Sequence, residues 1–238
     1  MRRIGLARVM SKRGWCSRSN AERMIREGRV SVRGVVVRDP ESPTLESELT
    51  ILLDGLKQDA PPRRYLMLNK PRGLVTTAQD ERARDTVYRC FDGTEMGWIA
   101  PVGRLDKASE GLLLFCNDPE WAASITDPAT GPSKTYHVQV AGIPDATVLQ
   151  RMEEGVDDDG EHLAASHAQL LRAGARNAWL EITLDEGRNR QIRRILSALD
   201  FEVLRLVRVA IGSLALGDLA KGAWRDLTEA EIAALRGE

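Results

Sequence analysis

The pattern of apolar and polar positions predicts short helices near the N-terminus and mainly strands after them. Residues 4–13 repeat apolar side chains at the i, i+3, i+4 spacing of a helix. A second helix follows, with Ser19 and Glu22 spaced as a capping box at its start and Gly28 at its end. The next stretch, RVSVRGVVV, alternates as a hairpin with a glycine turn does. The first part of the chain is therefore predicted to be a small unit of two helices and a hairpin.

After this unit, the stretch 57–64, KQDAPPRR, keeps neither period, and its two prolines indicate an exposed connector. Beyond it, residues 146–154 and the stretch RNRQIRRILSAL have helical spacing. Strand patterns occur in YLMLN and GLVTT on either side of a Lys-Pro turn, and in GLLLFCN, KTYHVQVAG, AWLEITLDEG and the pair within LRLVRVAIGSLALG. Because strands outnumber helices and several look hairpin-linked, we expect an α+β fold with a mixed, mainly antiparallel sheet flanked by helices. The predicted division is a domain at 1–58, a linker at 59–64 and a second domain at 65–238.

Composition narrows the class of protein. The chain of 238 residues is 42% hydrophobic and 29% charged. It has no run of the 18 to 20 apolar residues that a membrane span needs, and its first residues lack the apolar core of a signal peptide. The three cysteines lie far apart and form no Cys-x-x-Cys pair, which favours neither a disulfide framework nor a zinc site. We therefore expect a cytoplasmic protein with no membrane partner.

The net charge of −1 conceals a strong asymmetry. Residues 1–38 carry ten arginines and one lysine against Glu22 and Glu27, a net charge of +9, so the remaining 200 residues sum to −10. Such a cluster is typical of a module that binds a polyanion, although a basic, solvated helix face is the alternative. The candidate RNA-binding residues are Arg8, Lys12, Arg13, Arg18, Arg23, Arg26 and Arg29.

This N-terminal segment resembles the S-four-like RNA-binding domain. The likeness lies in SRSNAERMIREGRVSVRGVVV, where the family has Ser-Arg, a helix, Gly-Arg-Val and a strand with a glycine turn. The resemblance implies that two helices and the following strands present a basic surface to structured RNA.

Common nucleotide and metal motifs are missing from the sequence. It contains neither a phosphate-binding loop of the type G-x-x-x-x-G-K-[ST] nor G-x-G-x-x-G. The acidic run 157–159 lacks the alternating spacing of a calcium-binding loop, and we expect it to be a solvated turn. We expect no metal and no cofactor.

Two other stretches carry candidate chemistry. Asp106 follows Gly-Arg-Leu and precedes a strand, so a helix-capping role is weakened, although an ordinary turn aspartate is the alternative. In EGRNRQIRRILSAL, Arg188, Arg190, Arg193 and Arg194 lie near the start of a helix, where the helix dipole favours acids. We expect an anion to compensate these arginines, either RNA phosphate or a buried carboxylate.

These stretches resemble the motifs of pseudouridine synthases of the ribosomal small-subunit type and its large-subunit relatives. GRLDKASEGLLLFCND is similar to the catalytic motif, with Ser109 at the position of its Thr or Ser. LNKPRGLVTT, KTYHVQV, EGRNRQIRRIL and RVAIGSLALGDLAKGAWRDLT match four further blocks in the family's order. Together the blocks cover residues 65 to about 228.

The resemblance implies a role for each matching residue. Asp106 would be the catalytic aspartate, Tyr136 would stack on the target uracil, and Arg193 would be the ion-pair partner of Asp106. Arg104 would order the motif loop, Ile192 would form an apolar wall of the pocket, and the remaining candidates for substrate binding are Arg188, Arg190 and Lys70. From the pattern alone, Tyr136 could equally be an ordinary sheet residue and Ile192 plain core.

The implied reaction converts uridine to pseudouridine in ribosomal RNA, with the large-subunit RNA favoured and an assembly intermediate as substrate of a monomeric enzyme. One carboxylate can suffice because uracil departs as a delocalised anion. Asp106 could attack the ribose, attack the base or remove a ribose proton, and the sequence leaves these routes open. Two rivals remain: a non-catalytic RNA-binding or ribosome-binding protein, and a glycosidic hydrolase that uses Glu110 as its second carboxylate.

Overall fold

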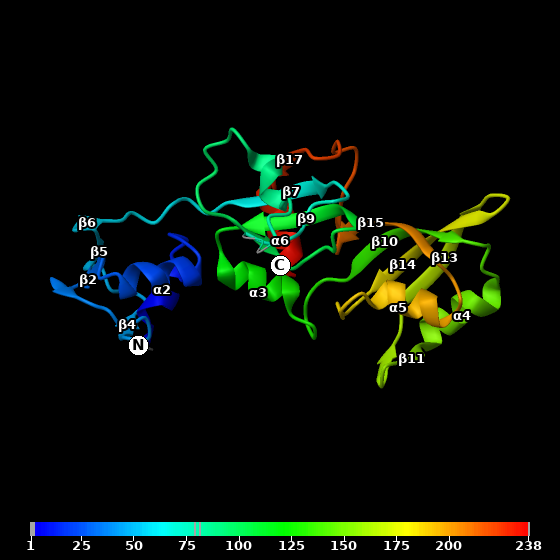
Figure 1. The fold of residues 1–238 in the computed structure, drawn as a ribbon, viewed down its shortest axis with the longest axis horizontal. Helices are drawn as coiled ribbons and strands as arrows, with labels where there is room; N and C mark the ends of the chain where they lie inside the picture. Colours follow the sequence, from blue (N-terminus) through cyan, green and yellow to red (C-terminus); the bar gives the residue numbers. More distant parts are fainter. Residues whose placement is uncertain (1–2, 79, 81, 238) are drawn as a thin grey trace. The chain divides into compact units, whose positions relative to one another are not determined.

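The computed structural model describes residues 3–78, 80 and 82–237 (Figure 1). By its internal contacts the chain forms two compact units. The first contains Met1–Tyr65, Gly93–Ala100 and Phe115–Ala122, and the second contains Leu66–Asp92, Pro101–Leu114 and Ala123–Glu238. The first unit thus includes two short segments from later in the chain. The predicted domain limits at 58 and 65 stay a prediction.

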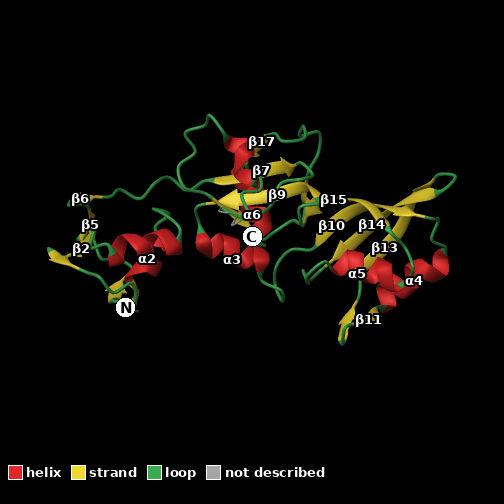
Figure 2. Ribbon diagram, viewed as in Figure 1, coloured by secondary structure: helices red, strands yellow, loops and turns green. Residues whose placement is uncertain are grey.

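The N-terminal part of the first unit, residues 3–57, consists of two helices and two small sheets (Figure 2). A two-stranded sheet pairs β1 with β4, and a four-stranded sheet has the order β3-β2-β5-β6. The elements are β1 (Arg3–Gly5), α1 (Leu6–Lys12), α2 (Arg18–Arg26), β2 (Val30–Val32), β3 (Val35–Val36), β4 (Pro43–Leu45), β5 (Ile51–Leu53) and β6 (Leu56–Lys57). Apolar faces of both helices, including Leu6, Met10 and Ile25, pack with Val30 and Ile51 into one core.

Two details of this unit differ from the sequence prediction. The first helix begins at Leu6 because residues 3–5 pair with β4 as a strand instead. The second helix is capped by Ser17, whose side chain accepts a hydrogen bond from Asn20 N at 3.2 Å, so the predicted capping box at Ser19 was wrong. The predicted hairpin is confirmed as β2 and β3.

The second unit is built on a nine-stranded sheet with the path β13-β14-β10-β15-β9-β7-β17, to which β8 and β16 are attached. Most pairs along this path are antiparallel, whereas β15 and β9 run parallel. The strands are β7 (Tyr65–Lys70), β8 (Ala100–Val102), β9 (Glu110–Cys116), β10 (Lys134–Ala141), β13 (His167–Ala173), β14 (Asn177–Leu184), β15 (Val203–Ile211), β16 (Leu214–Ala215) and β17 (Trp224–Asp226).

Helices α4 (Ala146–Glu154) and α5 (Gln191–Ala198) pack against this sheet (Figure 2). In β14 every second residue is buried, as the alternating sequence predicts, whereas all seven residues of β9 are buried. The buried face of β14 packs with Met152 of α4 and with Ile195 of α5. The helical elements are η1 (Val87–Phe91, a 3-10 helix), α3 (Pro119–Thr126), α4 (Ala146–Glu154), α5 (Gln191–Ala198) and α6 (Glu229–Arg236). The structure confirms the predicted α+β class with a mixed, mainly antiparallel sheet.

Two predicted elements of this unit take another form. The stretch GLVTT does not form a strand, and only an isolated bridge joins Val75 to Thr86. The acidic turn is part of a two-stranded ribbon, β11 (Val156–Asp158) and β12 (Glu161–Leu163). Within the part of the chain that the structure describes, no helix is long and apolar enough to cross a membrane.

Candidate active site

A cavity of about 740 Å³ in the second unit brings most of the predicted catalytic and substrate-binding residues together. Its wall contains seven of them, namely Arg104, Asp106, Tyr136, Arg188, Arg190, Ile192 and Arg193. These residues come from the loop before β9, from β10 and from the segment that enters α5. Residues 82 or more positions apart in sequence, such as Asp106 and Arg188, therefore share one cavity wall.

The loop that carries Asp106 is fixed through its backbone. The hydroxyl of Thr76 donates to the carbonyl of Leu105 at 2.7 Å and accepts from its amide at 3.3 Å. Lys70 Nζ donates to the carbonyls of Asp106 at 3.2 Å and Ser109 at 2.8 Å. These bonds hold the backbone on both sides of Asp106, while 35% of its side chain stays exposed. The carboxylate is thus open to a substrate on a rigid support.

The position of Lys70 is not the one expected for a residue that binds substrate. Its side chain is fully buried and does not line the cavity. Besides the two loop carbonyls it donates to the carbonyl of Pro71 at 3.2 Å. Burial lowers the pKa of Lys70 to about 8, although the nearby charges of Glu110 and Asp106 act to raise it. Lys70 therefore contacts the loop backbone and not the cavity, and its role in the reaction stays a prediction.

The arginine segment meets Asp106 through Arg190. Arg190 Nη1 lies 3.5 Å from Asp106 Oδ2, whereas Arg193, the predicted partner, forms no ion pair within 4 Å among the described residues. Arg190 directly precedes α5 and has the left-handed backbone angles φ 51° and ψ 30°. Such a conformation is costly for a residue with a Cβ and is found at sites where the surrounding structure enforces it.

Arg193 is half-buried beside the same carboxylate. Its Nη1 donates to the carbonyl of Val203 at 3.5 Å, and its buried Nε has no partner among the described residues. Burial lowers the pKa of the Arg193 guanidinium, the charge of Arg190 lowers it further, and the charge of Asp106 raises it. The charge of Asp106 therefore acts on the pKa of Arg193 without a direct ion pair. The catalytic role of Arg193 stays a prediction.

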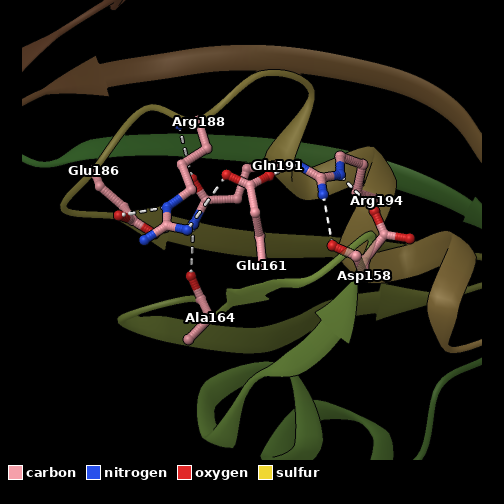
Figure 3. A network of polar contacts seen from close by, with 7 residues as sticks. All are labelled: Asp158, Glu161, Ala164, Glu186, Arg188, Gln191 and Arg194. Carbon is pink, nitrogen blue, oxygen red and sulfur yellow. Dashed lines mark hydrogen bonds and ion pairs between the residues drawn. The ribbon is translucent and has the colours of Figure 1, made fainter.

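The other arginines of this segment are compensated by carboxylates of the protein itself (Figure 3). Arg194 Nε lies 2.5 Å from Asp158 Oδ2, and its Nη1 lies 2.5 Å from Glu161 Oε2. Arg188 Nε lies 3.0 Å from Glu186 Oε2 and its Nη1 lies 3.6 Å from Glu161 Oε1. Asp157 is 86% exposed, as expected for a solvated acidic run, whereas Asp158 also pairs with Arg194, a contact that the sequence did not predict.

A buried amide completes this network (Figure 3). Gln191 Nε2 donates to the carbonyl of Ala164 at 2.9 Å and to Glu186 Oε1 at 3.0 Å, while its Oε1 accepts from the amide of Arg188 at 3.1 Å. Gln191 is 2% exposed, and its three bonds fix the bend that places Arg188 and Arg190 on the cavity wall. Sequence reasoning did not single out this glutamine.

Tyr136 and Ile192 serve the core and the cavity at once. Tyr136 lies on β10 and packs partly buried against the main core of the second unit. Ile192 belongs to the first turn of α5 and is 4% exposed. Both also line the cavity. The two interpretations of these residues are therefore compatible, and their roles toward a base stay predictions.

Glu110, the second carboxylate of the hydrolase alternative, is held elsewhere. It is 3% exposed, does not line the cavity, and pairs with Arg205 at 2.8 Å and with Lys221. The hydrogen bond from Arg205 is the largest influence that lowers the pKa of Glu110, to about 2, against the opposing effect of burial. A carboxyl group in this state is not a proton donor near neutral pH, which argues against a hydrolase with two carboxylates.

In the first unit, many of the predicted RNA-binding cations contact acids of the same unit. Arg18 pairs with Glu22 and Glu41, Arg23 with Glu27, Arg26 with Glu22, Arg29 with Asp54, and Lys12 with Glu46 and Glu120. Residues 39–54 supply five acids and no base, which the charge count over residues 1–38 did not include.

Arg8 and Arg13 are the two extremes among these cations. Arg8 is exposed and forms no ion pair among the described residues. Arg13 donates to the carbonyls of Glu46 at 2.6 Å and Glu48 at 2.5 Å, and its guanidinium lies 5.2 Å from the centre of the Trp15 ring. Arg13 is thus part of the framework of the unit, whereas Arg8 is open to a phosphate.

Two cationic residues that sequence reasoning missed also line the cavity, Lys134 on β10 and Arg208 on β15. Lys134 precedes Tyr136 by two positions in a strand, so the alternation of the strand places both on one face. That spacing was the available signal. Among the described residues, no group of three His, Cys, Asp or Glu side chains is arranged to hold a metal ion.

The sequence of this chain is similar to those of known protein families. Residues 64–198 match the model of the RNA pseudouridylate synthase family, and residues 4–47 match the model of the S4 domain. The chain belongs to the RNA pseudouridylate synthase family. Both resemblances drawn from the sequence are thereby confirmed. The family relationship identifies an isomerase that acts on RNA.

Individual relatives extend over nearly the whole chain of this RNA pseudouridylate synthase. The ribosomal large subunit pseudouridine synthase B of Bacillus subtilis is 36% identical over 233 residues, which cover 97% of this chain and 95% of that protein. An RNA pseudouridine synthase of Aquifex aeolicus is 35% identical over 99% of this chain and 94% of its own length. A crystal structure of a pseudouridylate synthase aligns with a TM-score of 0.69 at 30% identity, covering 98% of this chain and 99% of that one.

Proposed function

We propose that this enzyme isomerises a single uridine of ribosomal RNA, in the large-subunit RNA, while the RNA is part of an assembly intermediate. The ribosomal large subunit relative from B. subtilis, similar over almost the full length of both chains, supports this substrate. The observation that carries the proposal is the cavity itself, where the exposed carboxylate of Asp106 faces Arg190 and shares its wall with Tyr136. The enzyme acts as a monomer in the cytoplasm.

The chemistry needs one ionised carboxylate. Uridine becomes pseudouridine when the bond between ribose C1′ and base N1 breaks, the base turns, and C1′ joins base C5; the proton on C5 is replaced by one on N1. Asp106 takes part either by attack on the ribose, by attack on the base or by removal of a ribose proton. Arg190 Nη1 at 3.5 Å and half-buried Arg193 place positive charge beside the carboxylate of Asp106.

The cavity also has to hold a base that has left its ribose. Tyr136 offers an aromatic face for stacking, and Ile192 offers an apolar wall, so that the freed ring can turn without escaping. The target nucleotide must leave its stack to reach Asp106, which costs a few kcal/mol. Phosphate contacts to Arg188, Arg190 and Arg104 at the cavity, and to the S4 domain elsewhere on the RNA, would offset this cost.

The test compares wild-type protein, Asp106→Ala and Asp157→Ala on unmodified ribosomal RNA, both naked and in assembly intermediates. Asp157 is a suitable control because its side chain is 86% exposed on the ribbon outside the cavity. Pseudouridine is mapped by carbodiimide labelling and primer extension. We expect one new stop with wild type and Asp157→Ala and none with Asp106→Ala. Binding of RNA by all three proteins without any new stop would contradict the proposal and favour a non-catalytic RNA-binding protein.

A further inference from the structure

Arg208 is a buried cation in the cavity wall that the reaction scheme above does not use. It lies on β15 and is 5% exposed. Its Nε donates to the carbonyl of Leu112 at 2.7 Å, which fixes the guanidinium. No ion pair of Arg208 is found among the described residues, and its buried Nη2 has no hydrogen-bond partner there. Arg208 thus uses one of its five N–H groups and keeps an uncompensated charge.

The sheet pairs this arginine with the proposed stacking residue and with the strand that follows the loop carrying Asp106. Arg208 is the direct antiparallel partner of Tyr136 on β10 and the parallel partner of Gly111 on β9. A Cβ on Gly111 would lie 2.2 Å from the carbonyl oxygen of Arg208, so only glycine permits this approach. Opposed residues of neighbouring strands share one face of a sheet. The guanidinium of Arg208 is therefore at the edge of the surface on which Tyr136 would stack a base.

A second cation reinforces the positive charge at this place. Lys134 lines the cavity and is half-buried. Burial lowers the pKa of Lys134, the charge of Arg208 lowers it further, and Asp185 acts to raise it. A buried charge without a partner destabilises the folded state. A buried cation without a partner and a half-buried cation on the same wall are consistent with a site whose anionic partner arrives with the substrate.

We propose that Arg208, supported by Lys134, recognises the uracil ring and stabilises its anion. This inference rests on the proposed function. When the C1′–N1 bond breaks, both bonding electrons stay on the base, and the negative charge spreads over N1 and the two carbonyl oxygens. The unused N–H groups of Arg208 donate to one of these oxygens. The interaction is weak with neutral uracil and strengthens as charge develops, which lowers the barrier to bond cleavage.

The position favours the base over an RNA phosphate as the occupant. Arg208 is 5% exposed in the cavity wall, whereas Arg190, in the segment that enters α5, has 51% of its side chain exposed. The phosphates flanking a flipped nucleotide stay with the RNA strand. The base is the part that enters the cavity and becomes anionic within it.

The experiment measures single-turnover rates and RNA affinity for wild type, Arg208→Met, Arg208→Lys and the control Arg172→Met. Arg172 is an exposed arginine on the edge strand β13, where it lies 5.4 Å over the ring of Trp179 and outside the cavity. Each protein is tested on the target RNA with uridine and with 5-fluorouridine at the reacting position. Fluorine withdraws electrons from the ring and makes uracil a better leaving group, so it reduces the need for a stabilising cation.

We expect Arg208→Met to lower the single-turnover rate with uridine by about 10²- to 10³-fold, as for loss of one oxyanion donor, with unchanged RNA affinity. With 5-fluorouridine, the rate of glycosidic cleavage should fall much less, Arg208→Lys should be intermediate, and Arg172→Met should match wild type. Equal losses on both substrates, or a loss confined to RNA affinity, would overturn the inference in favour of a structural or phosphate-binding role. If the wild type cleaves only uridine, a loss of rate with unchanged RNA affinity supports the inference. A loss of affinity with an unchanged rate contradicts it.

Inactivity of the wild type on every RNA tested would contradict the proposed function, and with it the inference that rests on it. An active wild type combined with an unaffected Arg208→Met would contradict the inference alone. The two failures are therefore distinguishable.

Discussion

Arg190 Nη1 lies 3.5 Å from Asp106 Oδ2, and Arg190 reaches this position with a left-handed backbone, φ 51°. The left-handed conformation costs a residue with a Cβ about 1 to 2 kcal/mol. An exposed ion pair returns about 1 kcal/mol at most. The ion pair therefore does not offset the cost of the left-handed backbone in the free energy of unfolding. This points to a role of Arg190 in substrate turnover.

Arg190→Gly tests this trade-off. Glycine relieves the backbone strain but removes the guanidinium, so the free energy of unfolding should stay unchanged or rise by up to about 1 kcal/mol. The single-turnover rate should fall about tenfold or more, which corresponds to loss of one hydrogen bond to a charged group. Urea denaturation and a single-turnover assay measure the two quantities.

Asp159→Gly is the matched control for Arg190→Gly. Asp159 has φ 49° in the turn between β11 and β12 and does not line the cavity. The substitution should relieve similar strain and leave the rate unchanged. If Arg190→Gly retains the wild-type rate, Arg190 has no role beyond occupying the turn.

The lowered pKa of Lys70 predicts that the single-turnover rate depends on pH. Its pKa is lowered to about 8, and its ammonium group donates to the carbonyls of Pro71, Asp106 and Ser109. Loss of a proton above pH 8 removes one donor and the charge, which loosens the loop that carries Asp106. We expect the single-turnover rate to decrease above about pH 8, and Lys70→Met to be slow at every pH without this decrease.

As the pH rises, the contribution of Lys70 to the free energy of unfolding should change in the direction opposite to the rate. Because the folded-state pKa lies below the unfolded value of 10.5, the unfolded chain binds more protons between about pH 8 and 10.5. The contribution of Lys70 to the free energy of unfolding therefore rises over this window. A decrease in rate that persists in Lys70→Met, or that follows unfolding, would assign the pH effect to another group.

The sequence predicted this site well where the pattern is local. The strand GLLLFCN, the helix at 146–154 and the alternation of β14 follow from periodicity, and Asp106 was placed by the motif before β9. The pattern does not record which distant groups meet. That Asp106 pairs with Arg190 depends on a left-handed residue before α5, and nothing in RNRQIRRIL shows which arginine turns inward.

Burial was the other quantity hidden from the sequence. Lys70 was expected to bind substrate, but the close packing of β7 and the catalytic loop encloses it completely. Arg208 begins the block RVAIGSLALG, but its burial beside the loop that carries Asp106 depends on the parallel pairing of β15 with β9, two strands 87 residues or more apart in the chain. The acids that pair with the basic N-terminal cluster lie just beyond the segment over which the charge was counted.

The close packing around Gly111 predicts that one added methyl group lowers the stability of the protein strongly. Its φ is +100°, and an added Cβ would lie 2.2 Å from the carbonyl oxygen of Arg208. Gly111→Ala should lower the free energy of unfolding by about 1 to 3 kcal/mol from backbone strain, with a further loss from the displaced strand. Because β9 follows the catalytic loop, the rate should fall as well.

Gly160→Ala is the matched control for this effect. Gly160 has φ +76° in the turn of the ribbon, and nothing lies within 4 Å of the added Cβ. The difference between the two variants in urea denaturation therefore isolates the close approach of β9 and β15. Equal destabilisation of both variants would show that the approach of the strands is not limiting.

The S4 domain provides a last prediction, because its cations differ in what they contact. Arg8 is exposed without an ion pair among the described residues, whereas Arg13 is bound to the carbonyls of Glu46 and Glu48. Arg8→Gln should weaken RNA binding and reduce the slope of log affinity against log salt by about 0.7 to 0.9, which corresponds to one phosphate contact, with the stability unchanged. Arg13→Gln should instead lower the stability of the unit. Filter binding at several salt concentrations and thermal unfolding separate the two effects, and an unchanged slope in Arg8→Gln would remove Arg8 from the RNA-binding surface.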